Sequence, residues 1–172
     1  MNQYFLIYNC DKDEIKNIIS SFNINKGNGP NSIDTHILQL LKEDISGQLS
    51  EIFNLSFWTG LHPDLFKISK TIPIFKKGSW LLVSNYRPIS LLSNLNKILE
   101  KLMFTRMYKF LDYFKCIYAL QFVFRAKHST NHALIDITEN VKSALHACGI
   151  FVDLQKAFDT VNYKILLDKL SH

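Results

Sequence analysis

The sequence predicts an α+β fold that is rich in helix and contains one basic β-hairpin. Three observations lead to this prediction. Apolar residues recur at three- and four-residue spacing in several long stretches, as on one face of a helix. Two β-branched segments flank the basic turn Lys76-Lys77-Gly78-Ser79, which is typical of two antiparallel strands. The apolar run 148–152 is typical of a strand buried on both faces.

The composition is that of a globular protein, and its charge favours an anionic partner. Of 172 residues, 47% are hydrophobic and 20% charged, with only 6 Gly and 4 Pro, which excludes disordered and collagen-like chains. The net charge of +5 makes nucleic acid the first candidate partner. Three widely spaced cysteines indicate neither a disulfide framework nor a zinc site, so we expect an intracellular, reducing compartment. The apolar stretch 4–8 is too short for a membrane span.

Helical spacing predicts five helices. The first is a short amphipathic helix within residues 1–24, where Ile15, Ile18, Ile19 and Phe22 fall at helical spacing. The second runs from Ser32, capped by Asn31, to Thr59-Gly60. The third begins after Ser93, the fourth after Ser129-Thr130, and the last near Asn162. The residues expected on the buried face of the second helix are Ile33, Ile37, Leu41, Ile45, Leu49 and Ile52.

Asp153 is the sharpest chemical feature, because it ends the predicted buried strand at 148–153. A charge there is expensive to bury unless a cation offsets it, which favours a divalent ion. The alternative is an aspartate that only caps the following turn. Asp159, six residues later, has the same two interpretations, and turn stabilisation is the simpler one.

Four segments in order resemble motifs of one family. FVDLQKAFDTV (151–161) resembles the first catalytic motif of non-LTR retrotransposon reverse transcriptases, of the jockey-like kind. IPIFKKG (72–78) and NYRPISLLS (85–93) look like the fingers motifs, and residues 121–130 resemble the next motif. The resemblance implies fingers and an incomplete palm over residues 25–172, with residues 1–24 as an N-terminal extension.

The family's chemistry is RNA-directed DNA synthesis with two Mg²⁺ ions. The resemblance makes Asp153 catalytic and, with the backbone carbonyl of Leu154, a metal ligand. It implies an RNA template, a DNA primer and a dNTP as partners. The residues implied to bind the nucleotide are Lys76, Lys77, Arg87 and Phe158, and those implied to bind template or primer are Arg125 and Lys127. Lys77 could instead be a solvated turn lysine, and Phe158 a core aromatic.

Two departures from the family pattern bear on activity. Val123 stands where the family usually has Gly, which puts a close backbone contact with the template in doubt. The Tyr/Phe-x-Asp-Asp motif, which supplies the partner carboxylates, is not in the sequence, and neither are the thumb and endonuclease domains. We therefore expect this chain alone to be inactive. The alternative hypothesis is a non-catalytic nucleic-acid-binding remnant of a transposable element.

Overall fold

The computed structural model describes residues 7–24, 29–30, 33–154 and 157–171. It divides into two compact units, one up to Ile117 and one from Tyr118 onward, and each is described by itself. Together they form a helix-rich α+β structure with one two-stranded antiparallel hairpin, as the sequence predicts. No described helix is long and apolar enough to cross a bilayer.

Helix α1 (Lys12–Ser20) anchors the start of the first unit. The Asp11 carboxylate accepts a hydrogen bond from the Glu14 amide at 2.7 Å and so caps the helix. Ile15, Ile18 and Ile19 are buried against α2 and α3, as their spacing predicts.

Helix α2 (Thr35–Thr59) begins three residues later than predicted. The Asp34 carboxylate accepts from the His36 amide at 2.8 Å and takes the capping role expected of Asn31, which lies outside the described residues. Ile33 stays outside the helix, and its carbonyl accepts from the Asn94 side chain at 2.7 Å. Gly60 ends the helix in the left-handed conformation, φ 67°, which glycine adopts without strain.

The buried face of α2 is also partly mispredicted. Leu49 is buried and Ile45 packs against the core, as predicted. Ile37, Leu41 and Ile52 are exposed, and Leu38 and Phe53 enter the core instead. Apolar side chains lie on several sides of this helix, so periodicity alone does not say which side its neighbours cover. The packing of α1 against α2 makes that choice.

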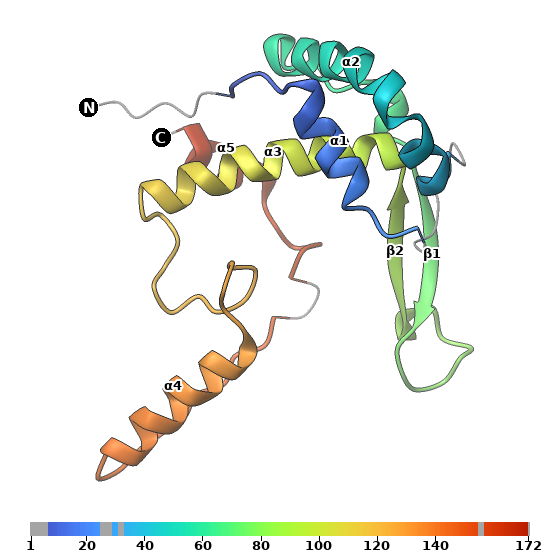
Figure 1. The fold of residues 1–172 in the computed structure, drawn as a ribbon. Coiled ribbons are helices and arrows are strands. Elements are labelled where there is room, and N and C mark those ends of the chain that lie inside the picture. The colour runs from blue at the N-terminus through green and yellow to red at the C-terminus, as the bar shows by residue number, and fades with distance from the viewer. Residues whose placement is uncertain (1–6, 25–28, 31–32, 155–156, 172) are drawn as a thin grey trace. The chain divides into compact units, whose positions relative to one another are not determined.

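The β-hairpin, called the ribbon below, consists of β1 (Ser69–Phe75) and β2 (Tyr86–Leu92). It projects from the helices of the first unit, and its far end is a loop (Figure 1). The register pairs Pro73 with Pro88 and Ile74 with Arg87. Both prolines are tolerated because each strand of a two-stranded ribbon is an edge strand.

Helix α3 (Asn94–Tyr113) completes the core of the first unit. Its start is confirmed: the Ser93 hydroxyl accepts from the Asn96 amide at 3.1 Å. Ile98, Leu99 and Leu102 are buried from its predicted apolar stripe.

Arg106, also on α3, is the one charged side chain among the described residues that is fully buried, with 1% exposure. Its guanidinium donates to both carboxylate oxygens of Glu14 on α1, at 3.1 and 2.9 Å. It also donates to the carbonyls of Tyr8, Asn9 and Leu102, and lies 4.3 Å from the centre of the Tyr8 ring. This arginine therefore ties the segment before α1 to α3.

The second unit contains α4 (Thr130–Ser143) and α5 (Tyr163–Ser171). Ser129 stands at the N-cap position of α4, and the Asn162 side chain accepts from the Ile165 amide at 3.2 Å, so both predicted starts are confirmed. The predicted buried strand at 148–153 is wrong: these residues are irregular and exposed. An all-apolar strand needs paired neighbours on its edges and cover on its faces, and the described residues supply neither.

Candidate nucleic-acid interface

The ribbon carries positively charged side chains on or next to its two strands. Lys76 and Lys77 follow β1, Arg87 lies one residue into β2, and all three side chains are exposed. The Lys76 amide donates to the Asn85 carbonyl at 2.8 Å, which closes the ribbon at its loop. Because side chains alternate between the two faces, Arg87 shares a face with Ile74 directly opposite and with Lys70 farther along.

An ion pair marks the other end of this basic region. Lys67 donates to Asp64 at 2.7 Å just before β1, and this hydrogen bond holds the pKa of the Asp64 carboxyl below its usual value. From residue 65 to residue 99 the chain has no other carboxylate to offset its cations. The ribbon therefore presents positive charge that its own sequence does not neutralise.

Residues 76–85, the ribbon tip, form an ordered loop. The Asn85 amide group donates to the Ser79 carbonyl at 2.7 Å, and the Tyr86 hydroxyl donates to the Trp80 carbonyl at 2.8 Å. Gly78 has φ 90°, and a Cβ there would lie 2.8 Å from the Asn85 side chain, so this turn favours glycine.

Arg125 and Lys127 lie in a compact loop of the second unit. The Arg125 guanidinium donates to the carbonyls of Tyr118 and Ala119, at 3.3 and 3.0 Å. Lys127 is exposed and has a positive φ, as has Phe124, whose ring is exposed. Val123 does not have a positive φ; the loop places its left-handed residues at Phe124 and Lys127.

Asp153 and Leu154 lie on the exposed irregular segment at 148–154, and Phe158 lies in the following turn with 80% exposure. Residues 155 and 156, between them, are outside the described residues. Neither the buried strand-end position expected of Asp153 nor a core position for Phe158 is observed. All three side chains are therefore exposed, and none of them packs in a core.

A metal centre needs several donors at one point, and among residues 7–24, 29–30, 33–154 and 157–171 no three His, Cys, Asp or Glu side chains converge. The Asp153 carboxylate and the Leu154 carbonyl are hard oxygen donors of the kind that Mg²⁺ takes. These two oxygens fit part of one magnesium site. A single carboxylate is too few to hold the two Mg²⁺ ions that the resemblance implies.

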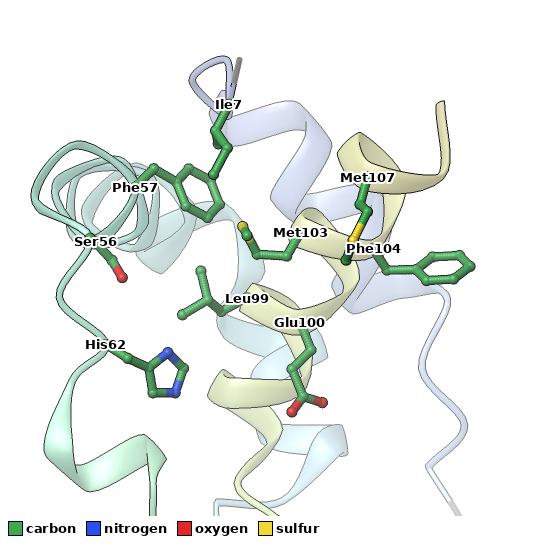
Figure 2. Close-up of a pocket in the computed structure, with 10 residues that line it drawn as sticks. Ile7, Ser56, Phe57, His62, Leu99, Glu100, Met103, Phe104 and Met107 are labelled. Carbon is green, nitrogen blue, oxygen red and sulfur yellow. The ribbon is translucent and has the colours of Figure 1, made fainter. Parts of the chain in front are cut away.

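The first unit contains an apolar cavity between α2 and α3. Its volume is about 330 Å³, and Figure 2 shows Phe57, Leu99 and Met103 pointing towards one another between α2 and α3, with His62 and Glu100 at one side. A space lined this way suits apolar groups and offers phosphates no cluster of cations. The ribbon, not this cavity, is therefore the candidate interface for an anion.

A comparison of the sequence with known families identifies the chain. The profile of the family described as reverse transcriptase, an RNA-dependent DNA polymerase, matches residues 74–172, more than half of the sequence. The chain belongs to the reverse transcriptase family. The residues predicted to act in catalysis or binding, from Lys76 to Phe158, all fall within the match.

Curated relatives of this reverse transcriptase chain come from mobile elements. It is 35% identical over 162 residues to an RNA-directed DNA polymerase from mobile element jockey of Drosophila melanogaster, covering 91% of the chain. The jockey protein of Drosophila funebris is 33% identical over 91% of the chain. A Pol polyprotein from the type-1 retrotransposable element R1 of Bradysia coprophila is 26% identical over 93%. The predicted resemblance to non-LTR retrotransposon enzymes is confirmed, and the chain spans 18% of the length of each jockey relative.

Sequence reasoning missed two features of the reverse transcriptase chain. The apolar tip residues Trp80 to Val83 are exposed, although their pattern alone fits a strand. Their position between Gly78 and Asn85, both turn formers, was the available signal. The burial of Arg106 had no local signal, because its partner Glu14 lies 92 residues earlier.

Proposed function

We propose that this chain provides the nucleotide-binding ribbon and a template-contacting loop of an RNA-directed DNA polymerase. The supporting observation is the charge of the ribbon region: residues 65–99 contain six lysines and arginines and no aspartate or glutamate. The phosphate backbone of a nucleic acid is attracted to such a surface, and counterions are released when the two bind. Membership of the reverse transcriptase family makes an RNA template, a DNA primer and a dNTP the proposed ligands.

Each proposed role follows from the chemistry of its side chain. Lys76 and Lys77 act as point charges on the triphosphate, and Arg87 offers a planar fork that can hold two phosphate oxygens. Phe158 lies against the sugar, where its ring would exclude a ribose 2′-hydroxyl. Arg125 and Lys127 contact the template or primer backbone, with Lys127 exposed and Arg125 fixed by its two carbonyl partners.

Asp153 is the proposed catalytic carboxylate. A bound Mg²⁺ ion would neutralise charge on the triphosphate and lower the pKa of the attacking hydroxyl. The Asp153 carboxylate and the Leu154 carbonyl would contribute two oxygens to that ion. Asp153 would hold its negative charge at the place where the ion must sit, and it needs further carboxylates to complete the site. We therefore propose that this chain alone does not extend a primer.

A second function is a non-catalytic nucleic-acid-binding module. The observation that favours it is that Asp153 is exposed and that no three His, Cys, Asp or Glu side chains in the described part of the chain come together to hold a metal ion. Such a module needs only the basic ribbon and loop. Primer extension separates the two proposals only when the chain is joined to the downstream palm of an intact relative: Asp153→Asn should then abolish extension while binding is unchanged.

The binding half of the proposal is tested with a fluorescent RNA–DNA primer–template in an anisotropy titration. We expect the affinity of the 172-residue chain to fall steeply with salt. The triple variant Lys76→Gln, Lys77→Gln, Arg87→Gln should reduce the slope of log K against log salt by about 2 to 3, since each neutralised phosphate contributes roughly 0.7 to 0.9.

A charge-matched control uses three lysines on the helices of the second unit, Lys142→Gln, Lys164→Gln and Lys169→Gln. It loses the same three charges and should retain most of the slope, because its lysines are not proposed to touch phosphate. Equal losses in the two triple variants would show that net charge, not the ribbon, governs binding. Binding that does not change with salt would contradict the proposal altogether.

A further inference from the structure

We infer that the ribbon tip is a stacking site for the bases of single-stranded nucleic acid, with Trp80 as its aromatic platform. The inference rests on the proposed function and deepens it, because it adds a contact with bases to the contacts with phosphates. Nothing in the phosphate-binding role of Lys76, Lys77 and Arg87 requires an aromatic residue at the tip.

The first observation is that the tip exposes four large apolar side chains in a row. Trp80 is 71% exposed and Val83 is 86% exposed, with Leu81 and Leu82 between them also exposed. Such a run is unfavourable in water, where apolar surface of this kind marks a place of interaction. A turn that only joins two strands needs polar residues with turn-forming backbones, not tryptophan and leucine.

The second observation is that hydrogen bonds from Tyr86 and Asn85 fix the backbone of this loop, while the apolar side chains remain exposed. The Tyr86 hydroxyl bonds the Trp80 carbonyl, the Asn85 amide group bonds the Ser79 carbonyl, and the Asn85 backbone amide donates to the Leu82 carbonyl at 3.0 Å. All three acceptors are backbone atoms. The Trp80 side chain therefore lies on a preorganised loop. Binding of a ligand costs little conformational entropy, because the loop backbone is already ordered.

The third observation identifies the occupant. Lys76 and Lys77 precede the apolar run by four and three residues, respectively, and no carboxylate occurs between residues 65 and 99. An aromatic surface flanked by lysines is complementary to a single strand, whose bases have flat faces and whose phosphates are anionic. An apolar protein groove would need no such charge, and a duplex keeps its bases stacked inside. Unpaired template is therefore the ligand that uses both features.

The test uses the chain's two tryptophans. Trp58, on α2, is also exposed, so Trp58→Phe leaves Trp80 as the single tryptophan, which is excited selectively at the red edge of the absorption band, and serves as the matched control for loss of a surface tryptophan. In this background, titration with an oligo(U) RNA of twelve nucleotides should quench Trp80 emission. An RNA of the same length with abasic positions throughout keeps the phosphates and should bind without quenching.

Affinity gives the second measurement. Trp80→Ala should weaken oligo(U) binding about 5- to 100-fold and leave abasic RNA binding unchanged, whereas Trp80→Phe should retain most of the affinity. Trp58→Phe should bind as the unaltered chain does. Because the Trp80 carbonyl is a backbone acceptor, Trp80→Ala keeps the bond from Tyr86, and an unchanged circular dichroism spectrum would verify the fold.

The outcomes separate this inference from the proposed function. If Trp80→Ala binds both RNAs like the unaltered chain, the stacking site is refuted and the phosphate-binding ribbon stands. If the unaltered chain binds neither RNA at low salt, both proposals fail. Vesicles of phosphatidylserine and phosphatidylcholine are the last arm: a blue shift of Trp80 emission with vesicles, and no quenching by oligo(U), would overturn the stacking site in favour of a lipid-binding tip.

Discussion

Helices α3 and α4 show the same apolar periodicity in the sequence and differ in what the structure does with it. Leu102 of α3 is fully buried in the core of the first unit, whereas Leu134, on the apolar face of α4, is 62% exposed. Both helices begin where a serine cap predicts. Local sequence therefore sets where a helix starts, and neighbouring elements set whether its apolar face contributes to stability.

The ribbon and the segment around Asp153 differ in the same way. The segment around Asp153 and most of the ribbon lie in the matched family region, 74–172. However, β1 pairs with β2 across a loop of ten residues, and the tip closes the pair with its own hydrogen bonds. The segment 148–154 has no strand beside it in the described part of the chain and remains irregular. A strand is stable only as part of a sheet, so elements that carry their own partner form and the others do not.

The largest expected effect comes from removing the buried charge on α3. Arg106→Ala should destabilise the first unit by about 3 to 5 kcal/mol, because it leaves the Glu14 carboxylate and the carbonyls of Tyr8 and Asn9 without their donor. Urea unfolding followed by far-UV circular dichroism measures this. Glu14→Gln, which keeps the guanidinium bonded to the carbonyls, should cost less, about 1 to 3 kcal/mol. An Arg106→Ala variant as stable as the unaltered chain would contradict the anchoring role.

The next prediction tests the two helices directly. Leu102→Ala should cost about 2 to 5 kcal/mol, because it opens a cavity in the core of the first unit. Leu134→Ala should change the stability by no more than about 0.5 kcal/mol, since the side chain it removes is already in contact with water. The same urea titration measures both variants, and equal losses would show that the face of α4 is covered in solution.

The smallest expected effect concerns the start of α3. Ser93→Ala removes the hydroxyl that accepts from the Asn96 amide and should cost about 1 kcal/mol. Ser93→Asp keeps an acceptor for the same amide, although the larger side chain must fit a buried position, so it should recover part of the loss. A thermal melt resolves this difference, and no change with alanine would show that the cap is dispensable.

Local signals were enough to predict much of this fold. The spacing of Ile15, Ile18 and Ile19 predicted α1, and the cap residues Ser93 and Gly60 predicted one start and one end. The basic turn between β-branched runs predicted the ribbon. In each case the determining interactions lie within a few residues along the chain.

Choices between competing local signals, and choices made by residues far apart in the sequence, could not be predicted in this way. The start of α2 depended on which of two capping residues, Asn31 or Asp34, the chain would use, and the buried face of α2 depended on α1. The strand expected before Asp153 failed because an apolar run predicts burial without saying what buries it. Of the proposed site, the positive charge of the ribbon was visible in the sequence, whereas the exposure of the apolar tip was indicated only by the turn formers Gly78 and Asn85 on either side of it.

The central claim is that this chain contacts nucleic acid through the ribbon, and photo-crosslinking tests it most directly. RNA containing 4-thiouridine would be bound to the 172-residue chain at low salt, irradiated, and the crosslinked peptides identified by mass spectrometry. We predict that crosslinks concentrate in residues 69–92, with Trp80 and its neighbours foremost, and that they fall away in the Lys76, Lys77, Arg87 triple variant. Crosslinks concentrated on α4 and α5, and unchanged in that variant, would contradict the claim.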